Sequence, residues 1–136
     1  MDVNMKILVA YNGTKVAKSA LKLARDYAQV FNAEIFILTS SEGGSHETAK
    51  DILNVQENIS FAKQFMAEKN ITCETHEMAR GLSPGEDIVQ FAQDHEIDQI
   101  YVGIKKRSRV QKLIMGSTAQ YVILKAKCPV ISVNYE

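Results

Sequence analysis

Continuous apolar runs alternate along the chain with segments of helical periodicity. The first run, at 6–11, is rich in strand-forming residues and stops at Asn12-Gly13. A run without polar alternation is typical of a strand that is covered on both faces of a parallel sheet. Segment 71–78 instead alternates apolar with polar residues, which predicts a half-exposed strand near a sheet edge. Further strands are predicted at 34–39, 99–102 and 129–133.

The segments between these strands predict amphipathic helices, because their apolar residues recur at steps of three and four. Thr14 is predicted to cap the first helix, and later helices are predicted over 47–69, 84–95 and 117–127. The residues predicted to face inward are Val16, Ala20, Leu23, Ala24, Tyr27, Ala28 and Phe31 in the first helix, Ile52, Val55, Ile59, Ala62 and Met66 in the second, and Ile88, Val89, Phe91 and Ala92 in the third.

The alternation of strands and helices predicts an α/β fold with a doubly wound parallel sheet. The chain has 136 residues, close to the size of one ordinary domain; 46% of them are apolar and 24% are charged. This composition argues against a disordered chain, a collagen-like repeat and a disulfide-stapled miniprotein. Because the sequence contains no repeat or linker, residues 1–136 are interpreted as a single domain.

Charge and cysteine content indicate a cytoplasmic protein without affinity for nucleic acid or membranes. Sixteen basic residues balance sixteen acidic ones, so no overall field attracts a polyanion. No apolar run approaches the ~20 residues that span a bilayer, and the polar start at 1–6 is too short for a secretory leader. Cys73 and Cys128 lie far apart without a CxxC motif, as expected of reduced thiols in the cytosol.

A G-x-S-x-G pattern at 81–85 matches the nucleophile elbow of a hydrolase. However, Pro84 follows Ser83 and has no backbone N–H to donate to an oxyanion, and the downstream His95 falls in the same helical region. A structural interpretation explains each residue: Ser83 caps a helix, Pro84 takes its first position, and Glu86 completes a capping box. The motif is therefore predicted to be a helix cap.

Other catalytic and metal-binding patterns are missing from the sequence. His46, His76 and His95 are dispersed and form no short ligand pair with a cysteine or carboxylate, so no metal site is predicted. The sequence contains neither G-x-G-x-x-G nor GxxxxGK[ST]. The protein is therefore predicted not to be an enzyme.

The most informative segment runs from Gly103, at the end of a buried strand, to Gly116-Ser117-Thr118, where the last helix begins. Glycine allows close backbone approach to a ligand, and free N–H groups at a helix start suit phosphate. In a chain of zero net charge, five cations between these ends form a local positive patch: Lys105, Lys106, Arg107, Arg109 and Lys112. A solvated loop followed by an ordinary serine cap is the alternative interpretation.

Topology favours a ligand site here, because doubly wound sheets bind ligands beyond the carboxyl ends of their strands, where strand order reverses. The end of the first strand, at 10–13, and the end of the fourth, at Gly103, are the neighbours expected at that place. We predict that a nucleotide would lay its base beside the first two strand ends and its phosphates beside Gly116 and Ser117.

Four fragments, taken in order and with their spacing, resemble the universal stress protein family. Segment 7–14 (ILVAYNGT) is similar to the family's opening I-L-V-x-V-D-G-S, and segment 103–117 is similar to its G-x2-G-x9-G-[ST] signature. The remaining matches are Gly81-x-x-Pro84 with Ile88, Ala92 and Asp98, which resembles a G-x-P…I…A…D segment, and Cys128-Pro129-Val130, which resembles a C-P-V ending. The resemblance covers almost the whole chain.

The resemblance implies a five-stranded parallel sheet in the order 3-2-1-4-5 and a regulatory protein that binds ATP or AMP, with Mg²⁺ only if ATP is bound. It also implies a homodimer that pairs through the last strand, at Val130, Ile131, Ser132 and Val133. The site residues that it implies are Ala10, Asn12 and Ser40 around the adenosine, and Gly103, Gly116, Ser117 and Thr118 around the phosphates and ribose.

Two departures from the family pattern leave alternatives open. Lys106 stands where the signature has its second glycine, and Asn12 where the family usually has an acid. Lys106 either blocks close approach of a phosphate or, with its neighbours, supplies charge-assisted contacts in place of backbone N–H groups. In the first case the protein is a nucleotide-free dimer that recruits a partner through its basic loop and segment 40–50. Slow ATP hydrolysis is a third, minor alternative, since no general base is evident beside Gly103 or Ser117.

Overall fold

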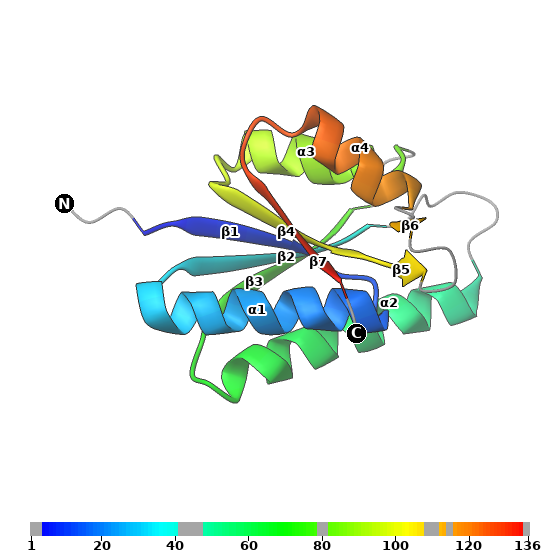
Figure 1. Ribbon diagram of the computed structural model, residues 1–136. Helices are drawn as coiled ribbons and strands as arrows, with labels where there is room; N and C mark the ends of the chain where they lie inside the picture. The colour runs from blue at the N-terminus through cyan, green and yellow to red at the C-terminus, as the bar shows by residue number, and fades with distance from the viewer. Residues whose placement is uncertain (1–3, 41–47, 79–81, 108–111, 114–115, 135–136) are drawn as a thin grey trace.

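A computed structural model describes residues 4–40, 48–78, 82–107, 112–113 and 116–134 and shows a central sheet with helices on both faces (Figure 1). Its five strands run parallel in the order β3-β2-β1-β4-β7. This confirms the predicted doubly wound α/β fold and its 3-2-1-4-5 order, with β7 as the fifth strand of the sheet. The strand bounds are Lys6–Ala10 for β1, Glu34–Ser40 for β2, Cys73–Met78 for β3, Gln99–Ile104 for β4 and Val130–Asn134 for β7.

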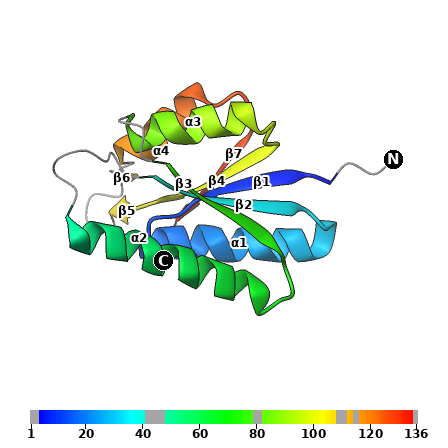
Figure 2. The ribbon, with the colours of Figure 1, turned by 180° about the vertical axis from the view of Figure 1, so that it is seen from behind.

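The helices form one layer on each face of the sheet, as both views show (Figures 1 and 2). Successive side chains of a strand point to opposite faces, so β1 supplies Ile7 and Val9 to one core and Leu8 to the other. Within the described residues no helix has the length and apolarity needed to cross a bilayer. The helix bounds are Lys15–Phe31 for α1 and Ala49–Ala67 for α2 on the first face, and Pro84–Asp94 for α3 and Ser117–Lys125 for α4 on the second.

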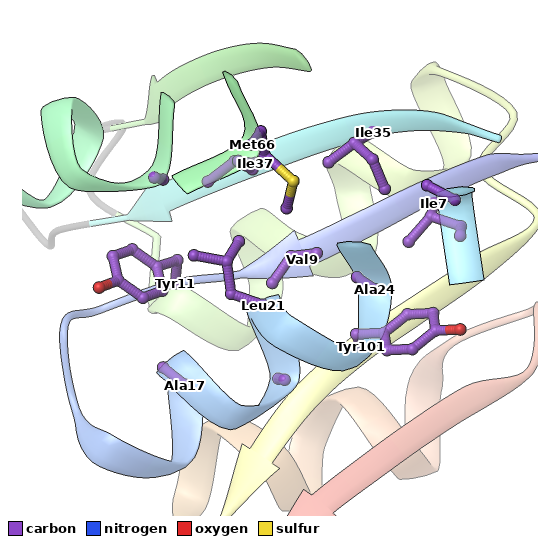
Figure 3. Packing of buried hydrophobic residues seen from close by; sticks show 13 residues of the cluster. Ile7, Val9, Tyr11, Ala17, Leu21, Ala24, Ile35, Ile37, Met66 and Tyr101 are labelled. Atoms are coloured by element: carbon purple, nitrogen blue, oxygen red, sulfur yellow. The ribbon is translucent and has the colours of Figure 1, made fainter. Parts of the chain in front are cut away.

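The core beneath α1 fixes the carboxyl end of β1. Figure 3 shows Val9, Leu21 and Met66 between the sheet and the helices, with Tyr11 beyond them at the end of the strand. All four residues are buried. The backbone N–H of Tyr11 donates to the Leu38 carbonyl of β2 at 3.1 Å, so the chain leaves the sheet only after Tyr11.

The two predicted helix caps, Thr14 and Ser83, are confirmed by their hydrogen bonds. The Thr14 side chain accepts from the Ala17 N–H at 3.2 Å at the start of α1. Ser83 accepts from the Glu86 N–H at 3.3 Å, and the Glu86 carboxylate in turn accepts from the Ser83 backbone N–H, with Pro84 in the first turn. These bonds satisfy N–H groups that a helix start would otherwise leave unpaired.

The G-x-S-x-G pattern is explained by helix packing as well as by capping. A side chain at Gly85 would bring its Cβ within 3.0 Å of Tyr121 Cβ and Cδ1, so this glycine lets α3 lie close to α4. Gly81, the first residue of the pattern, lies outside the described residues. The second glycine and the serine therefore serve the fold.

The predicted inward face of α1 is partly wrong. Leu23 and Phe31 are 43% and 61% exposed, and Val16 is only half-buried. Alanines 20, 24 and 28 lie between two adjacent stripes of the helix surface and are compatible with burial of either one. The stripe that packs against the sheet is the one that contains Ala17 and Leu21. The residues of α1 that are buried are Ala17, Ala20, Leu21, Ala24, Arg25 and Ala28.

The inward face of α2 is predicted correctly at three of its five positions. Val55, Ala62 and Met66 are buried, as expected. Ile52 is 47% exposed and Ile59 is half-buried. Among the described residues, α2 contacts the outer strands β2 and β3, and Ile52 lies in its first turn, close to the segment at 41–47 that the structure does not describe.

The predicted polar loop after Gly103 contains a short antiparallel hairpin, which the sequence analysis missed. Its strands are β5, Lys106–Arg107, and β6, Lys112–Leu113, with Lys106 opposite Leu113. Gly103 lies within β4, because that strand continues to Ile104. Arg109, another of the five predicted cations, falls outside the described residues.

Candidate functional site

A pocket opens at the carboxyl edge of the sheet, where β1 and β4 diverge toward helices on opposite faces. Its volume is about 820 Å³, within the usual range of small-molecule sites. The lining comes from the end of β1, the start of α1, the end of β4 and the start of α4. In an open α/β sheet this is the point at which strand order reverses and ligands bind.

The pocket brings together most of the residues that the sequence analysis singled out. For Ser40, the last residue of β2, and Lys106 in β5, the structure describes the backbone and not the side chain. The contribution of these two side chains stays a prediction. The predicted residues that line the pocket are Ala10, Asn12, Gly103, Gly116, Ser117 and Thr118.

Several lining residues were not among the predicted site residues. Pro84 and Ile88 of α3 form part of the wall, and Lys15 and Lys105 bring positive charge to it. The positions of Lys15 and Pro84 immediately after helix caps could have indicated them, because the start of a helix that follows a strand lies at the ligand edge of such a sheet. The contribution of α3 depends on its packing against α4, which no local pattern reveals.

Tyr11 forms a buried wall of the pocket. Its ring stacks on Phe61 of α2, with 6.1 Å between the ring centroids and 9° between their planes. The ammonium group of Lys18 in α1 lies 4.8 Å from the centroid of the same Phe61 ring. Burial raises the pKa of Tyr11 to about 12, so its hydroxyl is neutral at physiological pH.

Asn12 is held by a chain of hydrogen bonds that begins in α1. The Ala17 N–H donates to the Thr14 hydroxyl oxygen at 3.2 Å, and that hydroxyl donates to Asn12 Oδ1 at 2.7 Å. The backbone N–H of Thr14 donates to the same oxygen at 3.2 Å. Because an N–H can only donate, the amide oxygen of Asn12 faces Thr14 and its –NH₂ group faces away from it.

Gly13 makes the turn between Asn12 and the helix cap. Its φ of 83° lies in the left-handed region that glycine adopts without strain. A Cβ at this position would lie 2.5 Å from Asn58 Oδ1 of α2. The turn that shapes this side of the pocket therefore requires glycine for its conformation.

The start of α4 forms the opposite side of the pocket. Gly116 is the N-cap residue and makes no side-chain capping bond, so the alternative interpretation of Ser117 as the cap is wrong. The first N–H groups of a helix have no partner within it, and the helix dipole favours an anion beside them. No acidic residue occupies the first turn of α4. A Cβ on Gly116 would meet no described atom within 4 Å.

Gly103 has a packing role that the sequence did not predict. A Cβ there would lie 2.5 Å from the carbonyl carbon of Val16 and 2.8 Å from the nitrogen of Ala17. The residue therefore lets the backbone of α1 approach β4, and it lines the pocket from that position. Close approach of a helix accounts for a glycine at this position, and contact of Gly103 with a ligand stays a prediction.

Two of the histidines that are dispersed in the sequence, His76 and His95, are brought together near edge strand β3 and the end of α3. The rings of His76 and His95 lie 5.6 Å apart, and His95 stacks on Phe91 at 3.8 Å between centroids. His95 Nδ1 donates to the Phe91 carbonyl at 3.0 Å. The described residues contain no group of three His, Cys, Asp or Glu placed to hold a metal ion, and His46 lies outside them.

The fold and the pocket together define an α/β protein with a ligand-sized cavity at the switch point of a doubly wound sheet. The chain belongs to the universal stress protein family, whose model matches residues 4–134. A curated universal stress protein of Methanocaldococcus jannaschii is 30% identical over 140 residues, which cover 95% of this chain and 81% of that protein. The predicted family resemblance is thus confirmed.

Solved structures agree with this assignment. A universal stress protein from Archaeoglobus fulgidus superimposes with a TM-score of 0.84 at 33% identity, over 96% of this chain and 94% of that one. A second structure, the Archaeoglobus fulgidus universal stress protein in complex with dAMP, has a TM-score of 0.80 and 30% identity, over 97% of this chain and 99% of that one. The fold extends over nearly the whole chain in both comparisons.

Proposed function

We propose that this protein is a cytosolic regulatory protein that binds an adenine nucleotide, AMP or ATP, in the pocket between β1 and β4. The observation that carries the proposal is the pocket itself, which has the volume of a ligand site and gathers six predicted site residues at the switch point. The dAMP complex of a 30% identical relative supports an adenine nucleotide as the occupant.

The chemistry of the walls supports one orientation of the nucleotide. The adenosine lies beside Ala10 and Asn12, with Ser40 at the end of the next strand. The phosphates lie at the start of α4, where the N–H groups of Ser117 and Thr118 and the charge of Lys105 favour an anion. Lys106, the next residue along the chain, begins β5, and its contribution beside the phosphates stays a prediction.

Binding without turnover is the mode of action that we propose. A general base within reach of a water molecule is normally an Asp, Glu or His. The described lining contains none of these residue types. A regulatory protein instead uses the nucleotide to change its contacts with a partner, and measuring phosphate release with and without Mg²⁺ tests this point.

Isothermal titration calorimetry with AMP and with ATP is expected to show saturable binding at one site per chain. Thermal unfolding should shift upward in parallel, because a ligand that binds the folded state stabilises it. The absence of both heat and a melting shift at millimolar nucleotide would contradict the proposal and favour the nucleotide-free interaction protein.

Variants locate the site within this same experiment. Ser117→Ala removes a hydroxyl from the phosphate side and is expected to weaken binding by about 1 kcal/mol, or roughly fivefold in Kd. Ser60→Ala removes a hydroxyl from an exposed position of α2 outside the described lining and serves as the control. Equal affinities for the two variants would remove Ser117 from the site.

Homodimer formation through β7 is a further part of the proposal. On one side β7 pairs with β4, and it lies at the edge of the described sheet, with Val130, Ile131 and Val133 half-buried and Ser132 exposed. An edge strand presents unpaired backbone groups to a second copy, and a charged side chain on the edge opposes such pairing.

Ser132→Lys is therefore expected to raise the monomer fraction in light scattering, whereas Thr72→Lys, beside the opposite edge strand β3, leaves it unchanged. A parent chain that is already monomeric would refute this interface.

A further inference from the structure

We propose that this pocket takes its anionic ligand without a divalent metal ion, and that the presence of an amide rather than a carboxylate at Asn12 maintains this preference. The inference rests on the proposed function, since it concerns the same pocket and its phosphate-bearing ligand. It goes beyond that function by selecting the form of the ligand: a nucleoside monophosphate or metal-free ATP in preference to Mg·ATP.

The described walls of the pocket do not fit Mg²⁺. This ion is usually held by one or two carboxylates together with substrate phosphates and water. Among the described lining residues there is no Asp or Glu. The charged groups in the described lining, Lys15 and Lys105, are cations, which attract a phosphate and repel a second cation.

The amide oxygen of Asn12, at the end of β1, is not available to a metal ion either. Its amide oxygen already accepts two hydrogen bonds, from the Thr14 N–H at 3.2 Å and from the Thr14 hydroxyl at 2.7 Å. The group that remains is –NH₂, which donates hydrogen bonds and does not bind cations. Asn12 therefore offers a ligand a donor, which suits a phosphate or ribose oxygen.

The orientation of the Asn12 amide, with its oxygen toward Thr14 and its –NH₂ group away, is fixed by hydrogen bonds. Thr14 is tied into the first turn of α1 by the Ala17 N–H, and it bonds Asn12 Oδ1 through both its backbone N–H and its hydroxyl. Rotating the amide would set its –NH₂ group against the Thr14 N–H, so that two donors would face each other. The donor thus stays directed away from Thr14.

The parent protein tests the metal preference directly. Calorimetric titration with ATP is carried out once in EDTA and once in excess Mg²⁺, with AMP as a ligand that holds Mg²⁺ only weakly. We expect ATP to bind about threefold or more weakly in Mg²⁺, because the metal reduces the charge that the lysines attract. AMP should change by less than about twofold. Tighter binding of ATP in Mg²⁺ would overturn the inference, and no binding of either nucleotide in either buffer would overturn the proposed function with it.

Asn12→Asp tests the role of the residue. Aspartate keeps an oxygen for both Thr14 hydrogen bonds and replaces the –NH₂ donor by a carboxylate oxygen. We expect ATP affinity in EDTA to fall by about tenfold and to be partly restored by Mg²⁺, which reverses the metal response of the parent. Asn4→Asp makes the same charge change at an exposed position before β1, at the opposite end of the strand, and should behave as the parent does.

A third variant separates loss of the donor from gain of charge. Asn12→Ser has no carboxylate, so it should bind less tightly than the parent in both buffers and keep the parent's metal response. If Asn12→Asp and Asn12→Ser both bind ATP as the parent does, Asn12 is not the determinant. Circular dichroism shows whether each variant is folded. If one of the two Asn12 variants is not, the other variant and the parent protein decide whether Asn12 affects the metal response.

Discussion

Gly103→Ala is expected to destabilise the folded chain by about 3 kcal/mol, although it adds a single methyl group. The new Cβ would lie 2.5 Å from the Val16 carbonyl carbon and 2.6 Å from its oxygen. These neighbours are backbone atoms of α1, so no side-chain rotation can relieve the overlap, and β4 and α1 must separate. A denaturant titration measures the effect as a lower unfolding midpoint with an unchanged slope.

Gly116→Ser is the matched control for this prediction, since it also replaces a glycine of the pocket. Its Cβ would meet no described atom within 4 Å, and serine is a preferred N-cap residue. Its stability is expected to equal that of the parent or to exceed it by a few tenths of a kcal/mol. A Gly103→Ala variant as stable as Gly116→Ser would show that α1 approaches β4 less closely than the structure indicates.

The contrast between these two glycines shows what the sequence can and cannot reveal about the site. Both were selected because glycine at a strand end or a helix start permits close approach of backbone. The sequence does not say what approaches. At Gly103 it is the backbone at Val16, nearly ninety residues earlier in the chain, whereas at Gly116 the space is open among the described residues. A distinction of this kind depends on tertiary contacts, which no local pattern contains.

The same limit separates the well-predicted parts of the fold from the others. Buried strands and capped helices leave local patterns, and the 6–11 run, the Thr14 cap and the Ser83–Glu86 box were all identified from them. The buried face of α1 does not follow from such a pattern, because its alanines are compatible with burial of either of two neighbouring stripes of the helix. The hairpin of β5 and β6 was also missed, since its two-residue strands are polar and too short to show alternation.

Arg25 is the clearest residue that the pattern of apolar positions could not find. It lies in α1, yet its side chain is only 10% exposed. Its Nη1 donates to the Phe65 carbonyl in the last turn of α2 at 2.9 Å, and its guanidinium carbon lies 3.6 Å from the centre of the Phe65 ring. The N–H of Lys69, which would bond that carbonyl in a continuing helix, donates to the Met66 carbonyl instead.

Arg25 thus caps the carboxyl end of α2 from the neighbouring helix. The last turn of α2 contains no basic residue of its own, and a cation beside helix C-terminal carbonyls is favourable. Arg25→Ala is therefore expected to destabilise the protein by about 3 kcal/mol, through the lost charged hydrogen bond and the lost stacking on Phe65. Urea unfolding followed by circular dichroism measures the loss.

Two further variants decide which contact of Arg25 carries this stability. Glu68 lies 3.5 Å from Arg25 Nη1, but its side chain is 59% exposed, so Glu68→Gln should cost less than about 1 kcal/mol. Arg25→Met keeps the apolar stem and removes the donor, and it should recover only part of the loss seen in Arg25→Ala. If Glu68→Gln destabilises as much as Arg25→Ala, the ion pair rather than the bond to the Phe65 carbonyl joins α1 to α2. The order Arg25→Ala, Arg25→Met, Glu68→Gln, from the most to the least destabilising, is the result that capping across the two helices requires.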